Sequence, residues 1–243
     1  MKSFAIIVGI IIFFSCSSTR KLSEVSKQVL VYSKTQAYRH ASIAEGKLAM
    51  LKLGAENKWT VDTTENAAVF NAVNLKKYKT VVFLNTSGNV LDEEQQIVFQ
   101  DFIRGGGSFV GIHAASDTEK DWPWYNNLVG AYFKGHPKPQ NARYNVIDKT
   151  FPAVSFLPDT INRFEEIYNF YNFKSDLVKV VMTVDEKSYS GGNMGDFHPI
   201  AWYHTYDGGK AFFTAWGHHP ETFKEELFLK HITAAIKWAT ASK

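Results

Sequence analysis

The chain has 243 residues, of which 45% are hydrophobic and 15% aromatic, and its 27 basic side chains nearly balance its 24 acidic ones. This length is enough for one α/β domain with a sizeable core. The balanced charge excludes the clustered positive excess by which nucleic-acid-binding proteins are recognised, so we expect no nucleic-acid partner.

The first residues have the pattern of a secretory signal. Lys2 supplies a positive charge, residues 4–14 are almost wholly apolar, and Cys16, the one cysteine of the chain, follows among small residues. The apolar stretch is shorter than the roughly 20 residues of a membrane-spanning helix. The pattern resembles a bacterial lipoprotein signal, and an ordinary signal peptide or short anchor is the alternative. We therefore expect a signal peptide over residues 1–15, lipid on Cys16 and a tether over residues 16–27. The protein would then be held in the cell envelope, facing the periplasm, with the lipid as its membrane contact.

Residues 28–240 form the predicted domain, and its first half alternates between strand and helix patterns. Continuous apolar runs predict strands, each apolar on both faces, at residues 29–33, 59–62, 80–84 and 108–112. Ser42 with Glu45 forms a capping-box pattern, which predicts a helix that buries a stripe through Ala44, Leu48 and Leu51. Asp92 caps a second predicted helix, which Gly105 ends. Strands of this kind, joined through helices, indicate a parallel sheet covered on both faces.

The second half is less regular. Four further strands are predicted, at residues 165–171, 178–184, 200–206 and 210–215. A closing helix over residues 225–240 carries an apolar stripe, namely Phe228, Ile232, Ala235 and Ala239. The sequence therefore predicts an α/β fold with a doubly wound, mainly parallel sheet, helices on both faces and insertions in its second half.

Histidines occupy loops where predicted strands end, which is the edge of a doubly wound sheet that binds ligands. They are His40 beside Arg39 after the first strand, His113 followed by Asp117 after the fourth strand, His136 in the connecting region, and His218 after the strand at residues 210–215. A lone loop histidine more often makes a structural hydrogen bond, but several at one edge favour a binding or catalytic site.

Five motifs in order resemble the ThuA-like, or trehalose-utilisation, family. They are GGGSFVGIH at residues 105–113, GAYFKGHP at 130–137, EEIYNF at 165–170, PIAW at 199–202 and GKAFFTAWGH at 209–218. The resemblance implies a flavodoxin-like fold related to class I glutamine amidotransferases, whose catalytic cysteine sits at a strand-to-helix elbow. His113 stands at that position here, and no cysteine occurs after Cys16. Glutamine hydrolysis by the amidotransferase route is therefore excluded, because it needs a thiol nucleophile.

The resemblance also implies a carbohydrate substrate, with family members near pathways for trehalose and 3-keto sugars. Our leading hypothesis is proton transfer beside a sugar carbon, with His113 as base, Tyr168 or Glu166 as acid, and Asp117 orienting His113. Period-two spacing would place Glu166 and Tyr168 on one face of a strand. Arg39, His40, His136, Trp202 and His218 would contact the sugar.

Two alternatives stay open. His113, His136 and His218 with Glu166 form a plausible ligand set for zinc or another divalent metal, although no local ligand spacing marks them. The protein could instead be a non-catalytic, lipid-tethered module that binds sugar on aromatic platforms, above all Trp122 and Trp124. The oligomeric state is not readable from the sequence.

Overall fold

The computed structural model describes Met1 and residues 29–241. The predicted leader from Lys2 onward, the lipidation site Cys16 and the tether lie outside these residues. In the part of the chain that the structure describes, no helix is both long and apolar enough to cross a membrane.

A nine-stranded mixed sheet forms the centre of the domain, in the order β2-β1-β3-β4-β11-β10-β9-β6-β7. Its first five members run parallel: β2 (Val61–Thr64), β1 (Val29–Tyr32), β3 (Thr80–Leu84), β4 (Ser108–Ile112) and β11 (Gly209–Thr214). This parallel part has the strand order of flavodoxin-like folds. The other four follow in antiparallel pairs: β10 (His198–Tyr206), β9 (Lys179–Val184), β6 (Gln140–Val146) and β7 (Thr160–Glu165).

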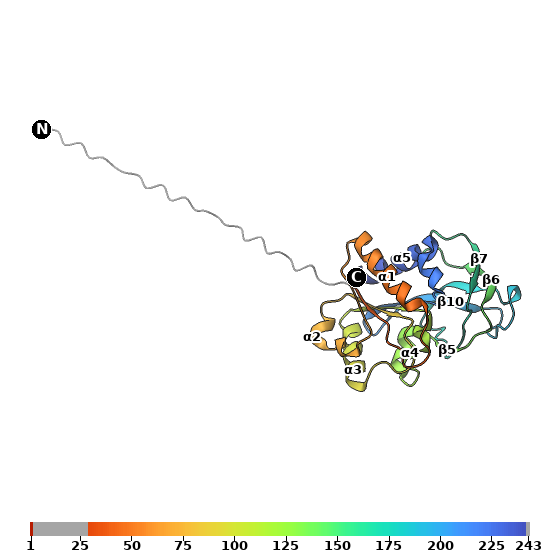
Figure 1. Cartoon of the computed structure of the whole chain (residues 1–243), viewed down its shortest axis with the longest axis horizontal. Helices are drawn as coiled ribbons and strands as arrows, with labels where there is room; N and C mark the ends of the chain where they lie inside the picture. Colours follow the sequence, from red (N-terminus) through yellow and green to blue (C-terminus); the bar gives the residue numbers. More distant parts are fainter. Residues whose placement is uncertain (2–28, 242–243) are drawn as a thin grey trace.

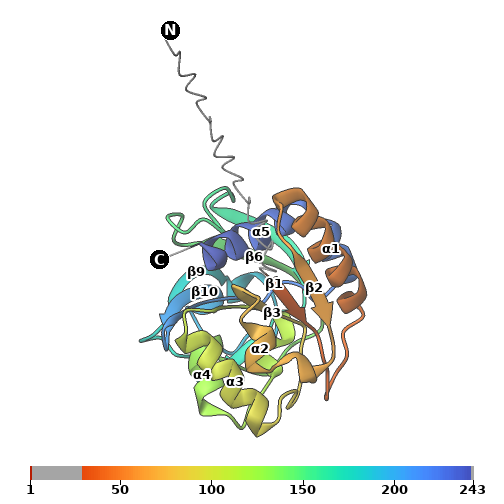
Figure 2. The same cartoon turned by 90° about the vertical axis from the view of Figure 1, so that its left-hand side faces the viewer.

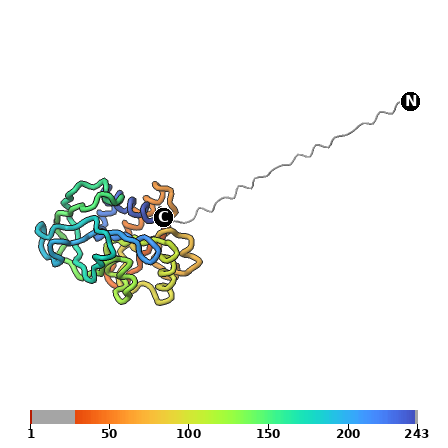
Figure 3. Tube along the Cα trace, turned by 180° about the vertical axis from the view of Figure 1, so that it is seen from behind, coloured from red at the N-terminus to blue at the C-terminus, as the bar shows by residue number. Residues whose placement is uncertain are grey.

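Helices cover both faces of the sheet. Figures 1 and 2 show α1 (Ser42–Asn57) and α5 (Glu226–Thr240) on one face, with α2 (Ala72–Leu75), α3 (Glu93–Arg104) and α4 (Pro123–Val129) on the other. A separate ribbon of β5 (Tyr132–Gly135) and β8 (Asn169–Tyr171) completes the elements near the site. Figure 3 shows most of the second half of the chain, green to blue, gathered at one end of the domain. The predicted doubly wound fold with insertions in its second half is therefore confirmed.

Several predicted elements are confirmed at or near their bounds. Strands β3 and β4 occupy the predicted residues, and Asp92 caps α3 with a complete capping box. The stripe of α5 is buried throughout, because its four apolar residues pack on the sheet.

The predicted start and buried face of α1 were wrong. Ser42 is inside the helix, and its hydroxyl donates to the Gly217 carbonyl oxygen instead of capping the helix. Leu48 and Leu51 are exposed, while the helix buries the face that carries Gly46 and Met50. A side chain at Gly46 would collide with Leu84, so the small residue lets α1 pack closely on the sheet.

The predicted strand over residues 165–171 was also wrong. Glu165 ends β7, Asn169 begins β8, and these strands belong to different sheets. The residues between them form an irregular connector, which carries Glu166 and Tyr168.

Candidate functional site

Three loops at the carboxyl ends of parallel strands meet above the sheet. His40 follows β1, His113 follows β4 directly, and His218 follows β11. The imidazole ring of His40 lies edge-on to those of His113 and His218, with ring centroids 4.9 Å and 5.3 Å away. The connector between β7 and β8 adds Glu166, which is buried among them. The sheet topology thus brings together side chains from four distant parts of the sequence.

His113 occupies an elbow where β4 turns into a short 3₁₀ helix, His113–Asp117. Its φ of 49° is left-handed, a conformation that residues other than glycine adopt uncommonly. The Nδ1 atom lies 2.7 Å from the carbonyl oxygen of Ala215. Because a carbonyl oxygen only accepts hydrogen bonds, Nδ1 donates its proton there. The Nε2 atom is then the one that faces Glu166, at 3.3 Å from Oε2.

The Glu166 carboxylate is the meeting point of three imidazoles. Its Oε2 atom lies 2.9 Å from His218 Nδ1 as well as near His113, and its Oε1 atom lies 3.1 Å from His136 Nδ1. Burial acts to raise the pKa of Glu166, but hydrogen bonds from His113 and His218 outweigh it and hold the pKa below its usual range. Glu166 is therefore an ionised carboxylate at neutral pH.

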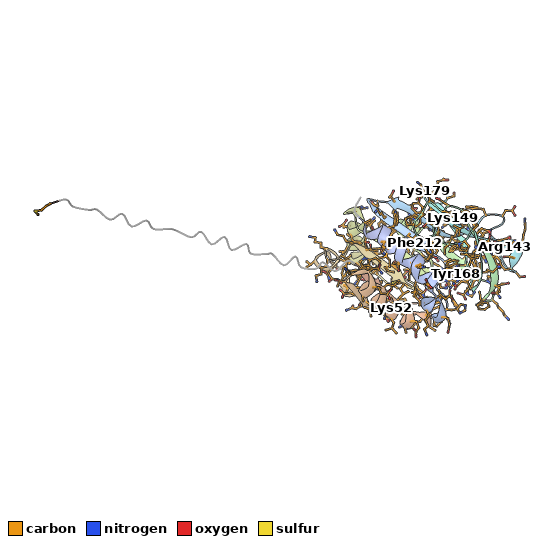
Figure 4. The ribbon with its side chains drawn as sticks, turned by 90° about the horizontal axis from the view of Figure 1, so that it is seen from above. Lys52, Arg143, Lys149, Tyr168, Lys179 and Phe212 are labelled. Atoms are coloured by element: carbon orange, nitrogen blue, oxygen red, sulfur yellow. The ribbon has the colours of Figure 1, made fainter. Side chains whose placement is uncertain are left out.

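Tyr168 and His40 close the inner wall of the site. Tyr168, labelled in Figure 4, is 2% exposed, and its ring packs on His113 at a centroid distance of 4.1 Å. Its hydroxyl lies 3.4 Å from His40 Nε2. Burial raises the pKa of Tyr168 well above its usual value, so this phenol stays protonated and is a hydrogen-bond donor, not a base. Burial, and then the nearby His113 and His218, lower the pKa of His40 to about 3, so its imidazole is neutral at neutral pH.

The cluster has the dimensions of a metal site. One ligand atom from each of His40, His113, Glu166 and His218 lies within 4.8 Å of the other three. Tetrahedral zinc with bonds of about 2.0–2.1 Å to nitrogen and oxygen keeps its ligand atoms about 3.3 Å apart. His218 Nδ1 lies 3.3 Å from His113 Nε2, which matches that spacing. The hydrogen bond from His113 to a backbone carbonyl is also the outer contact that metal-binding histidines usually make.

This ligand set differs from the predicted one in one member. His40, predicted to contact substrate, belongs to the set of four. His136, predicted as a ligand, contacts the outer oxygen of Glu166 and has a side chain 37% exposed. His136 therefore stands at the opening of the site.

Sequence reasoning missed two supports of the cluster. Asn85, at the end of β3, donates to the Ser42 hydroxyl and the Gly217 carbonyl and accepts from the Ala114 N–H, so it joins the three histidine-bearing loops. Glu165 accepts from the backbone N–H of His218 at 3.1 Å and pairs with buried Arg163. The polar residue Asn85 at the end of an apolar strand was a usable signal for the first support.

Other predicted site residues lie elsewhere or have other partners. The Asp117 carboxylate pairs with Lys120 at 2.5 Å, whereas Ala215 holds His113 Nδ1, so the predicted orienting role of Asp117 was wrong. Arg39 forms an exposed ion pair with Glu65.

The predicted aromatic platforms are mainly packing residues. Trp202 is fully buried and donates to the Val129 carbonyl. Trp122 and Trp124 stack on each other, and Trp124 donates to Asp207. An exposed ring does lie beside the cluster, since Tyr38 is 64% exposed and its ring centroid is 4.8 Å from that of His40.

The fold and the site define an α/β protein with an imidazole–carboxylate centre at the carboxyl edge of its sheet. The family model for ThuA, described as trehalose utilisation, matches residues 28–239, and the chain therefore belongs to this family. The comparison with curated proteins found no match.

Solved structures share the fold. A ThuA-like protein from Bacteroides uniformis is 23% identical with a TM-score of 0.75, and the match covers 89% of this chain and 93% of that one. A ThuA-like protein from Parabacteroides merdae is 17% identical with a TM-score of 0.72, over 89% and 90% of the two chains. A beta-galactosidase from Rahnella sp. R3 is 15% identical with a TM-score of 0.57, and the match covers 90% of this chain but 32% of the enzyme.

Proposed function

We propose that this protein is a carbohydrate-active enzyme that acts on a glucoside or 3-keto sugar, with a divalent metal ion held by His40, His113, His218 and Glu166. Membership of a family described as trehalose utilisation supports the substrate class. The observation that carries the metal is the orientation of His113. Its Nδ1 proton is committed to Ala215, which leaves Nε2 to face the same point as Glu166 Oε2 and His218 Nδ1.

Zinc suits this donor set best, because three imidazoles and one carboxylate are among its usual ligands. The ion would act as a Lewis acid on a sugar carbonyl or on adjacent hydroxyls. His136, at the opening and in contact with Glu166, would then transfer the proton to or from the substrate. Tyr168, which stays protonated, would donate a hydrogen bond to a sugar oxygen. In this arrangement His113 is a ligand, so the role of base moves from His113 to His136.

The first test measures metal and turnover in the same samples. We expect purified protein to hold about one metal ion per chain by elemental analysis, and His113→Ala and His218→Ala to lose it. His219→Ala is the matched control, because His219 adjoins His218 but lies outside the ligand set. Conversion of trehalose, glucose and 3-keto glucosides is followed by NMR with and without a chelator. Turnover that survives both the chelator and His113→Ala would refute the metal-dependent mechanism.

One observation favours a second candidate, a module that binds sugar without converting it. Exposed Tyr38 beside His40 offers a ring face on which a sugar ring could stack. Under this alternative, Tyr38→Ala weakens sugar binding at least as strongly as His136→Ala does, and no substrate is converted. Under the enzyme hypothesis, His136→Ala abolishes turnover while sugar binding largely survives.

We also propose that the protein is anchored in the cell envelope through lipid on Cys16, because the leader resembles a lipoprotein signal. Mass spectrometry of the amino-terminal peptide from cells tests this proposal directly. A diacylated Cys16 at the new amino terminus is the expected result. A peptide cleaved at another position without lipid would contradict it.

A further inference from the structure

We infer that a second sugar-binding subsite adjoins the histidine–glutamate cluster, so that the substrate is a glycoside whose second group is itself neutral and polyhydroxylated. This inference rests on the proposed function and specifies its substrate. The candidate subsite is a pocket of 520 Å³, within the range of small-molecule sites. Its lining residues are Gln36, Ala37, Gly88, Asn89, Asp117, Lys120 and Asp121.

The pocket lies where this fold is built to bind ligands. Its residues come from the loops that follow β1, β3 and β4. After β1 the chain enters α1 on one face of the sheet, and after β3 it enters α3 on the other face (Figure 2). Loops that diverge in this way open a crevice at the topological switch point, outside the carboxyl ends of the strands. The crevice is therefore a consequence of strand order.

The three loops hold each other in register. Thr35 pairs with Ser87 and Gly88 with Thr118 as isolated parallel bridges beyond the ends of the strands. The Gln36 N–H donates to the Ser87 carbonyl at 2.7 Å, which ties the β1 loop to the β3 loop. The pocket is thus lined by backbone that is fixed before a ligand binds, which lowers the entropy cost of binding.

A chain of contacts connects the pocket to the cluster. Lys120 Nζ lies 5.1 Å from the ring centroid of Phe133, and that centroid is 4.2 Å from the one of Tyr168. Tyr168 packs directly on His113. Asp117 also ends the 3₁₀ helix that His113 begins. A ligand that occupies both places therefore spans Phe133 and Tyr168, a distance suited to two adjoining rings.

The side chains of the pocket select a neutral polyol. Two carboxylates and one ammonium group give the lining a net negative charge, which disfavours the phosphate groups that many switch-point crevices bind. The amides of Gln36 and Asn89 both donate and accept hydrogen bonds, and the carboxylate of Asp121 accepts them from hydroxyls. Asn89 Nδ2 donates to Asp121 at 3.2 Å, so these two residues present a joined pair of polar groups.

The test compares methyl α-glucoside with trehalose, which differ by the second ring. Both sugars are titrated into the purified, metal-loaded protein by calorimetry, and NMR follows the side-chain amide signals of Gln36 and Asn89. We expect tighter binding of trehalose, with amide shifts that methyl α-glucoside does not produce. Asn89→Ala and Asp121→Ala should each weaken trehalose binding by about tenfold and leave methyl α-glucoside binding unchanged. Asp196→Ala, an exposed aspartate outside the pocket, is the matched control.

The outcomes separate the two proposals. Equal affinity for the two sugars, or trehalose binding that both variants leave unchanged, would overturn the subsite and leave the proposed function standing. Failure of the unmodified protein to bind either sugar would count against the proposed function itself, and the subsite would fall with it.

Discussion

Buried His231 makes the stability of this fold sensitive to acid. It lies in α5 with no exposed surface, its Nδ1 atom is 2.8 Å from the Ala153 carbonyl oxygen, and its Nε2 atom is 3.1 Å from the Thr214 hydroxyl. The carbonyl accepts only, so Nδ1 donates and the neutral ring accepts from Thr214 through Nε2. A second proton would break the bond from Thr214 and place a charge in the core. Burial accordingly lowers the pKa of His231 from 6.5 to about 4.

The sign and size of the effect follow from linkage. As the pH falls below 6.5, the unfolded chain binds a proton at this histidine while the folded chain does not, so the free energy of unfolding decreases. The decrease continues until the pH reaches about 4, where the folded chain also binds the proton. At about 1.4 kcal/mol for each pKa unit, the full loss is about 3 kcal/mol. The stability is fully present above pH 6.5.

Urea unfolding of the wild type and His231→Asn, measured between about pH 7.5 and about pH 4.5, isolates this term. The asparagine amide can still donate to Ala153 but cannot titrate in this range. Groups common to both proteins, such as His40, cancel in the difference. We expect the wild type to lose up to about 3 kcal/mol more than the variant as the pH falls. Parallel curves for the two proteins would show that His231 is already protonated in the folded state, and would refute the reasoning.

Three further substitutions test the site and its supports. Asn85→Ala should cost about 2–3 kcal/mol in urea unfolding and lower metal retention, because its buried amide joins three loops; wild-type stability would contradict that role. Gly217→Ala should cost about 1–3 kcal/mol by the same assay, since φ is 121° and the new Cβ would lie 2.8 Å from Ile112. Gly195→Ala, with a left-handed φ but open space around it, is the control that reports strain alone. Trp124→Phe should leave sugar affinity unchanged by calorimetry, because its indole is engaged in packing; a weakened affinity would restore it as a sugar platform.

The parallel half of the sheet was predictable from the sequence because its strands are buried on both faces. Such strands are continuous apolar runs, as in TVVFL of β3, and they are read directly. The strands β6 and β7 were missed because each has exposed positions and a polar composition, QNARYNV and TINRFE. A search for apolar runs cannot detect strands whose polar residues face water. The face of α1 was misjudged for a related reason, since two glycines, Gly46 and Gly54, form part of its buried surface.

The site was predictable at the level of residues and loops but not of contacts. Strand ends placed His113 and His218 at one edge, and the rule that parallel strands end together made them neighbours. Glu166 and Tyr168 were identified, although the connector that carries them is not a strand. The membership of His40 in the ligand set depends on how far the loop after β1 folds back, and no local pattern encodes that distance.

A divalent ion resolves an electrostatic conflict within the cluster. His113 Nε2 and His218 Nδ1 lie 3.3 Å apart, and both face the same oxygen of Glu166. If both nitrogens carried protons, two imidazole N–H groups would crowd one oxygen atom. If neither did, their lone pairs would face a carboxylate in a buried site. A metal ion bound to all three atoms satisfies each lone pair at once, and neutral His40 can complete the set without adding charge. The left-handed backbone of His113 is then strain that the bound ion helps to offset, because it is this conformation that places Nε2 in the cluster.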